Sequence, residues 1–189
     1  MKTMNYFKTS KFFLLTITTL TLASCSNDDS PVNEEEVITT VTTTLTGGGQ
    51  VITLRSRDLD GDGPNAPVVT VSGNLTANTT YLGETVFTNE TVSPAEDITV
   101  EVEEEGDEHQ IFYQFPVALG SIVYTDVDAN GDPIGLSFTL TTGTSATTGN
   151  IVVTLRHLPN KSGAGVASGD ITNAGGATDA QVTFPVVIN

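Results

Sequence analysis

Hydrophobic and polar residues alternate with a period of two through most of the chain from residue 37 onward. Between residues 134 and 141, for example, apolar side chains occupy every even position and small or hydroxyl residues occupy most of the others. This period, with its many Val, Ile, Thr, Phe and Tyr residues, is typical of half-buried antiparallel strands. The pattern predicts about nine strands, at residues 37–45, 51–55, 68–71, 81–88, 111–115, 122–125, 134–141, 151–155 and 182–188.

These segments predict an all-β fold, an antiparallel β-sandwich with the general architecture of immunoglobulin-like domains. Small polar residues fill the connection at residues 142–148, so we expect the strands on either side of it to be neighbours in a hairpin. Pro185 has no N–H to donate to a ladder, which predicts that the last strand lies at an edge or carries a bulge.

One segment departs from the alternation and predicts a helix. Ser93 is a capping residue, Pro94 would occupy the first helical position, and Glu96 follows three residues after the cap. Gly106 would end the helix. We therefore expect one short helix near residues 94–105, at one end of the sandwich.

The first 24 residues have the pattern of a secretory signal peptide. Three lysines and no acid accompany an apolar stretch at residues 12–22, which is shorter than the roughly 20 residues of a spanning helix. The string Leu-Ala-Ser-Cys at residues 22–25 resembles the lipobox of bacterial lipoproteins. The resemblance implies cleavage before Cys25 and covalent lipid on that cysteine, which would hold the mature chain on a membrane.

The mature chain divides into a tether and one domain. Residues 25–36 are polar and acidic, which predicts a lipidated cysteine followed by a disordered tether. The acid cluster is similar to the export tags of surface lipoproteins in bacteroidete-type cells, and a solvated linker explains it equally well. Residues 37–189 predict a single β-sandwich domain. The expected location is the cell envelope, at the outer membrane. The sequence does not indicate whether the domain faces the periplasm or the outside of the cell.

Charge excludes one class of partner. Loss of the first 24 residues would leave 4 basic residues against 23 acidic ones, a net charge of −19 compared with −16 for the whole chain. Nucleic acid is therefore excluded, whereas divalent cations and cationic partners are attracted. Cys25 is the single cysteine, so the chain has no disulfide to stabilise it after export.

Two aspartate-rich loops are candidate calcium sites, because oxygen ligands at every second position can surround a hard cation. The first contains Asp58, Asp60 and Asp62, and the weaker second contains Asp126, Asp128, Asn130 and Asp132. Neither has the glutamate that ends an EF-hand loop. The alternative is that Asp, Asn and Gly simply form turns, and Asn130-Gly131 favours that alternative in the second loop.

No catalytic constellation is evident in the sequence. His109 and His157 could form an acid–base pair or a zinc site, but no HExxH motif, nucleophile elbow or Cys–His arrangement accompanies them. We expect solvated or capped histidines and no enzyme activity. Arg55 and Arg156 end similar strand patterns, and we expect both to pair with the acidic helix. The lack of tryptophan argues against a glycan-binding site built on an aromatic platform.

Three strings carry a resemblance to a known family. They are Asn-Glu-Glu-Glu-Val-Ile-Thr-Thr at residues 33–40, Arg-Asp-Leu-Asp-Gly-Asp-Gly-Pro-Asn-Ala-Pro at 57–67 and Leu-Arg-His-Leu-Pro-Asn-Lys at 155–161. They resemble an uncharacterised family of flavobacterial, bacteroidete-type lipoproteins, some of which are described as type 1 periplasmic binding fold superfamily proteins. That description implies a two-lobed α/β receptor, whereas this chain is too short for two lobes and lacks strand–helix alternation.

The expected function is therefore a non-enzymatic binding or structural role of a membrane-anchored lipoprotein, with an unidentified protein or glycan partner. The alternative is a glycan- or solute-binding accessory lipoprotein. A pocket with converging polar groups would favour ligand binding, and a flat exposed patch would favour a protein partner.

Overall fold

The computed structural model describes residues 36–61 and 63–189. The predicted signal peptide, Cys25 and all of the tether except Glu36 lie outside the described residues. Strands make up 48% of the structure, and the described residues contain a single α-helix, which confirms the prediction of an all-β sandwich.

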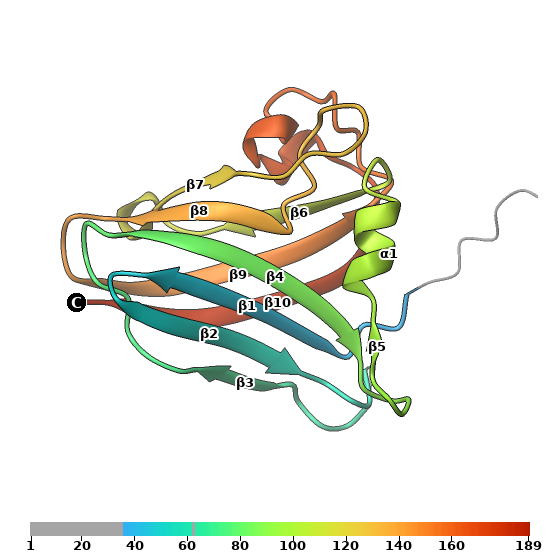
Figure 1. Cartoon of the computed structure of the whole chain (residues 1–189), viewed down its shortest axis with the longest axis horizontal. Helices are drawn as coiled ribbons and strands as arrows, with labels where there is room; N and C mark the ends of the chain where they lie inside the picture. The colour runs from blue at the N-terminus through green and yellow to red at the C-terminus, as the bar shows by residue number, and fades with distance from the viewer. Residues whose placement is uncertain (1–35, 62) are drawn as a thin grey trace, which may run out of the picture. The chain divides into compact units, whose positions relative to one another are not determined.

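The strands form two antiparallel sheets (Figure 1). The larger contains β1 (Thr40–Gly47), β2 (Gln50–Arg57), β3 (Val68–Val71), β4 (Thr80–Asn89), β5 (Glu96–Asp97), β7 (Gly120–Tyr124) and β8 (Ser137–Thr142). Its order is β3-β2-β1-β4-β8-β7, and β5 pairs with β4. The smaller contains β6 (His109–Gln114), β9 (Thr147–His157) and β10 (Ala177–Ile188), in the order β10-β9-β6. Three short 3-10 helices, at Val117–Leu119, Val166–Ser168 and Ile171–Asn173, lie in the connections.

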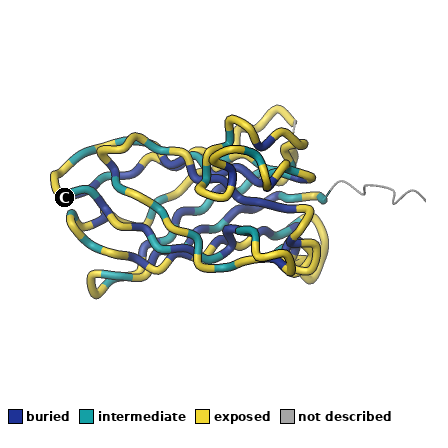
Figure 2. The backbone as a smooth tube through the Cα atoms, turned by 90° about the horizontal axis from the view of Figure 1, so that it is seen from above, coloured by how far each residue is buried: buried dark blue, intermediate teal, exposed yellow. Residues whose placement is uncertain are grey.

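A single main core lies between the two sheets, and Figure 2 shows buried backbone running through the interior with exposed loops around it. Strand β4 shows how alternation builds this core: Tyr81 and Phe87 are fully buried, while Leu82 on the opposite face is 64% exposed. Gly83 faces inward, where a Cβ would collide with the ring of Phe138. The glycine therefore makes room for an aromatic side chain from the neighbouring strand.

The prediction that the strands on either side of residues 142–148 are neighbours is wrong. Strand β8 pairs with β4 and β7, whereas β9 pairs with β6 and β10. The connection at residues 143–146 therefore crosses from one sheet to the other. Both strands bury one apolar face, and a short run of small residues serves a crossover as well as a hairpin.

The helix α1 (Thr99–Glu104) begins later than the capping pattern at Ser93 predicts. Glu96 and Asp97 are extended and pair with the end of β4, so the chain cannot be helical there. Asp97 Oδ1 instead accepts a hydrogen bond from Thr99 N at 3.1 Å, at the actual start of the helix. Tertiary pairing has overridden a local start signal.

The last strand matches its prediction. Strand β10 lies at an edge of the smaller sheet, and its register with β9 shifts between Thr178 and Ala180. This shift is a β-bulge that leaves Asp179 out of the ladder. The bulge helps to place the side chain of Asp179 near His109.

Replacing Phe87 by alanine should lower the free energy of unfolding by about 3–5 kcal/mol, because a fully buried aromatic ring leaves a cavity. The matched control is Leu82→Ala on the exposed face of the same strand, which should cost about 0.5 kcal/mol or less. Urea denaturation measures both values. Equal losses would contradict the assignment of the two faces of β4.

Candidate metal centre

His109 and His157 lie directly opposite each other in the smaller sheet. His109 is the first residue of β6 and His157 the last of β9, and the ladder pairs them. Their rings stack with centroids 4.8 Å apart and an interplanar angle of 18°. Both side chains are buried, so the expectation of solvated histidines is wrong. They share the inward face with Ile111 and Leu155, two residues along each strand.

Two buried carboxylates approach this pair from other segments. Glu36 lies just before β1, and its side chain is 3% exposed. Asp179 is the residue left out at the bulge of β10, and its side chain is 5% exposed. A bulge re-aims the side chain of its extra residue. His109 Nε2 lies 3.0 Å from Glu36 Oε1 and 3.9 Å from Asp179 Oδ2.

The hydrogen bond at His109 Nδ1 determines whether Nε2 is a donor or an acceptor in the neutral ring. His109 Nδ1 lies 3.1 Å from the carbonyl oxygen of Glu105, and a carbonyl only accepts, so Nδ1 must carry a hydrogen. In a neutral ring Nε2 then presents a lone pair, which faces a carboxylate oxygen of Glu36. Two acceptors at 3.0 Å need a cation between them, either a proton or a metal ion.

The four side chains supply a ligand set for a transition metal. One donor atom each from Glu36, His109, His157 and Asp179 all lie within 4.8 Å of one another. Two imidazole nitrogens and two carboxylate oxygens are ligands that zinc accepts, and a tetrahedral site would space them roughly 3.4 Å apart. Binding therefore requires side-chain movements of about an ångström. The second oxygen of Glu36, Oε2, is buried with no hydrogen-bond partner among the described residues.

Further acids surround the cluster. Glu108 Oε2 lies 3.5 Å from His157 Nε2. The pKa of Glu101 is raised above its ordinary value, first by burial and then by the negative charges of Glu36, Glu105 and Glu96. The excess of negative charge at this end of the sandwich favours a bound cation.

The first aspartate loop is held by its own hydrogen bonds. Asp60 Oδ2 accepts from Asn65 Nδ2 at 2.7 Å, and Asp58 Oδ1 accepts from Asp60 N at 3.3 Å. The bond from the Asn65 side chain is the main reason why the pKa of Asp60 is below its ordinary value. Asp62 lies outside the described residues, so calcium binding by this loop stays a prediction.

A lysine occupies the second aspartate loop. Lys161 Nζ donates to Asp128 Oδ2 at 2.8 Å and to the carbonyl oxygens of Pro133, at 3.0 Å, and Gly106. Asp128 Oδ1 accepts from the backbone N–H groups of Asn130 and Asp132. Burial raises the pKa of Asp128, but these bonds and the lysine charge outweigh it and hold the pKa below its ordinary value.

The other three residues of this loop do not complete a cation site in the described structure. Asp126 accepts hydrogen bonds from the backbone N–H groups of Gly135 and Ser137, at 2.9 and 3.0 Å. Asn130 and Asp132 donate their backbone N–H groups to Asp128. These contacts support the turn-forming alternative, and an ammonium group takes the place that a metal ion would have.

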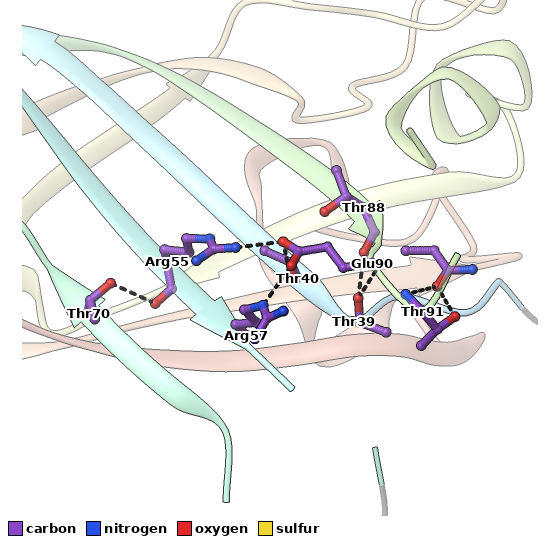
Figure 3. Close-up of polar contacts among 9 residues, drawn as sticks. Thr39, Thr40, Arg55, Arg57, Thr70, Thr88, Glu90 and Thr91 are labelled. Carbon is purple, nitrogen blue, oxygen red and sulfur yellow. Dashed lines mark hydrogen bonds and ion pairs between the residues drawn. The ribbon is translucent and has the colours of Figure 1, made fainter. Parts of the chain in front are cut away.

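The arginines do not pair with the helix, which corrects the expectation for Arg55 and Arg156. Figure 3 shows Arg55 and Arg57 converging on Glu90, with both nitrogen–oxygen distances at 2.6 Å. Arg156 instead donates to Thr178 Oγ1 at 2.6 Å. The pKa of Glu90 is lowered to about 2, and the hydrogen bond from Arg57 is the largest cause. The sequence could not indicate this pairing, because β1 lies between β2, which carries the arginines, and β4, which Glu90 directly follows.

Comparisons with known proteins returned no match for this chain: no family model, no curated protein and no solved structure matches it. Within residues 36–61 and 63–189, no helix is long and apolar enough to cross a membrane. The lipoprotein resemblance therefore stays a prediction.

Replacing Lys161 by methionine should lower the free energy of unfolding by about 3–5 kcal/mol, because it leaves the buried Asp128 carboxylate unpaired. The double variant Lys161→Met/Asp128→Asn should recover part of that loss, since no unpaired charge remains. Urea denaturation of both variants tests this. If the double variant is no more stable than the single one, the ion pair does not have the assigned role.

The carboxyl of Glu90 should make stability depend on acid pH. Its pKa is about 2 in the folded protein against an ordinary 4.5, so its contribution is complete above about pH 4.5 and lost as the pH falls towards 2. Glu90→Gln should therefore be less stable than wild type at neutral pH, with a difference that shrinks between about pH 4.5 and 2. Urea denaturation across this range measures the difference, and a constant difference would refute the assignment.

Proposed function

We propose that the chain is a non-enzymatic, lipid-anchored protein of the cell envelope that binds a divalent transition metal ion, preferably zinc, between its two sheets. Its ligands are Glu36, His109, His157 and Asp179. The observation that carries this proposal is the contact of His109 Nε2 with Glu36 Oε1 at 3.0 Å, while Nδ1 is committed to the carbonyl of Glu105. A backbone carbonyl on the far ring nitrogen is also the usual device that orients a metal-binding histidine.

A metal ion explains the site better than a proton does. Glu36 and Asp179 together carry two negative charges in a buried place. A proton shared by His109 Nε2 and Glu36 Oε1 would serve only that one contact, at 3.0 Å. A divalent ion could instead bind all four donor atoms, that of His157 included, since these lie within 4.8 Å of one another.

The donor types select the metal. Imidazole nitrogen suits zinc and its neighbours among the transition metals, whereas calcium and magnesium prefer ligand sets made only of oxygen. Four protein ligands complete a tetrahedral shell, which is typical of structural rather than catalytic zinc. This supports a non-enzymatic role.

The bound metal would link parts of the chain that no disulfide can join. Glu36 precedes β1 of the larger sheet, whereas the other three ligands come from β6, β9 and β10 of the smaller one. Cys25 is the single cysteine and is committed to lipid in this proposal. The metal would thus fasten the two sheets together close to the tether that leads to the outer membrane.

The alternative of a solute-binding lipoprotein has one observation in its favour. A cavity of about 450 Å³ lies between α1, β4 and the loop after β7. Its lining includes Glu84, Glu103, Glu104 and Asp107, so its charge suits a cationic solute better than a neutral glycan.

Zinc titration tests the proposal. The metal-free full chain, purified in detergent, should bind one zinc ion in a calorimetric titration. His157→Ala should weaken binding at least about 100-fold, because even residues behind the ligands account for 10- to 100-fold in affinity. Glu104→Gln removes an acid outside the cluster and should bind zinc as the wild type does.

The same preparation loaded with cobalt should show the intense visible absorption of a tetrahedral site, and His157→Ala should lose it. Absence of zinc binding by the wild type, or equal binding by wild type and His157→Ala, would refute the proposal and leave Glu36 as a polar partner of His109.

A further inference from the structure

We infer that the metal centre contains a second cation position, built only from oxygen ligands, in which Glu36, Glu101 and Glu105 bind a hard divalent ion and Glu36 bridges both positions. This inference rests on the proposed function and extends it from one metal ion to two. Glu101 and Glu105 are not ligands of the zinc site, and Glu36 is shared by both positions.

The geometry of α1 supplies two of the three ligands. Glu101 lies in α1 and Glu105 directly follows it, so they are four positions apart and their side chains share one face. One oxygen each from Glu36, Glu101 and Glu105 all lie within 4.8 Å of one another. These three and the histidine cluster are the two groups of described side chains whose spacing suits a metal ion.

Glu36 belongs to both groups. Its Oε1 faces His109 Nε2 at 3.0 Å. Its Oε2 is buried and has no hydrogen-bond partner among the described residues, and the side chain is only 3% exposed. A buried carboxylate oxygen without a partner is costly, and a second cation would bind it.

Like charge also favours a cation at this position. The carboxylates of Glu36, Glu101 and Glu105 lie close enough to repel one another, and a cation between them would offset that repulsion.

The chemistry of the second position differs from that of the first. It offers no nitrogen or sulfur ligand, and Glu101 and Glu105 are exposed, so water can complete its shell. Calcium and manganese accept such sets of carboxylates and waters, whereas zinc gains most at the histidines. Manganese is the probe of choice, because its free ion gives a direct paramagnetic resonance signal.

The test titrates manganese into the zinc-loaded full chain in detergent and follows the free ion by electron paramagnetic resonance. The wild type should bind one manganese ion. The double variant Glu101→Gln/Glu105→Gln should bind it at least about tenfold more weakly, since ligand charge sets the affinity of such sites. The matched control is Glu103→Gln/Glu104→Gln, which removes the same charge from positions between those two residues and should bind manganese as the wild type does. All three proteins should retain one zinc ion.

Two failures can be told apart. Coinciding manganese isotherms for the two double variants, with zinc binding intact, would overturn the second position and leave the proposed function standing. Failure of the wild type to bind zinc would overturn the proposed function and the bridged pair together.

Discussion

The convergence of two buried carboxylates on His109 and His157 is the interaction on which this end of the sandwich depends. Each carboxylate would be unfavourable there alone, because burial removes its hydration. The fold nevertheless directs both inward: the β6–β9 register sets the histidines face to face, and the bulge in β10 turns Asp179 toward them. The chain before β1 adds Glu36. A cation bound between Glu36, Asp179 and the two histidines is the simplest condition under which these four buried side chains stabilise the structure.

Alternation predicts the strands well but says little about their order. The phase of Ile134, Leu136, Phe138 and Leu140 indicates which side chains are buried, and all four are buried in the structure. The same phase cannot tell which sheet a strand joins, which is why β8 and β9 were wrongly expected to be neighbours. The predicted helix start at Ser93 failed for a related reason, since the pairing of β5 with β4 is a tertiary contact that local capping signals do not contain.

The site shows the same division between local and tertiary information. His109 and His157 have the phase of Ile111 and Leu155, so alternation alone could have placed both rings in the core. Asp179 carried no such signal, because an unbulged strand would not direct it to this position. Glu36 was one acid in an acidic tether. The aspartate loops were easier to notice because their spacing is visible along the chain, whereas the residues of the candidate metal centre come from four distant segments.

The chain has one cysteine and so cannot fasten its two sheets with an internal disulfide, whereas a metal ion held by Glu36, His109, His157 and Asp179 would link them. Anomalous diffraction at the zinc absorption edge, from crystals of the zinc-loaded protein, tests this claim most directly. The account predicts a peak within about 2.0–2.2 Å of one donor atom of each of these four residues. A map without a peak there, in which His109 Nε2 still lies 3.0 Å from Glu36 Oε1, would contradict it.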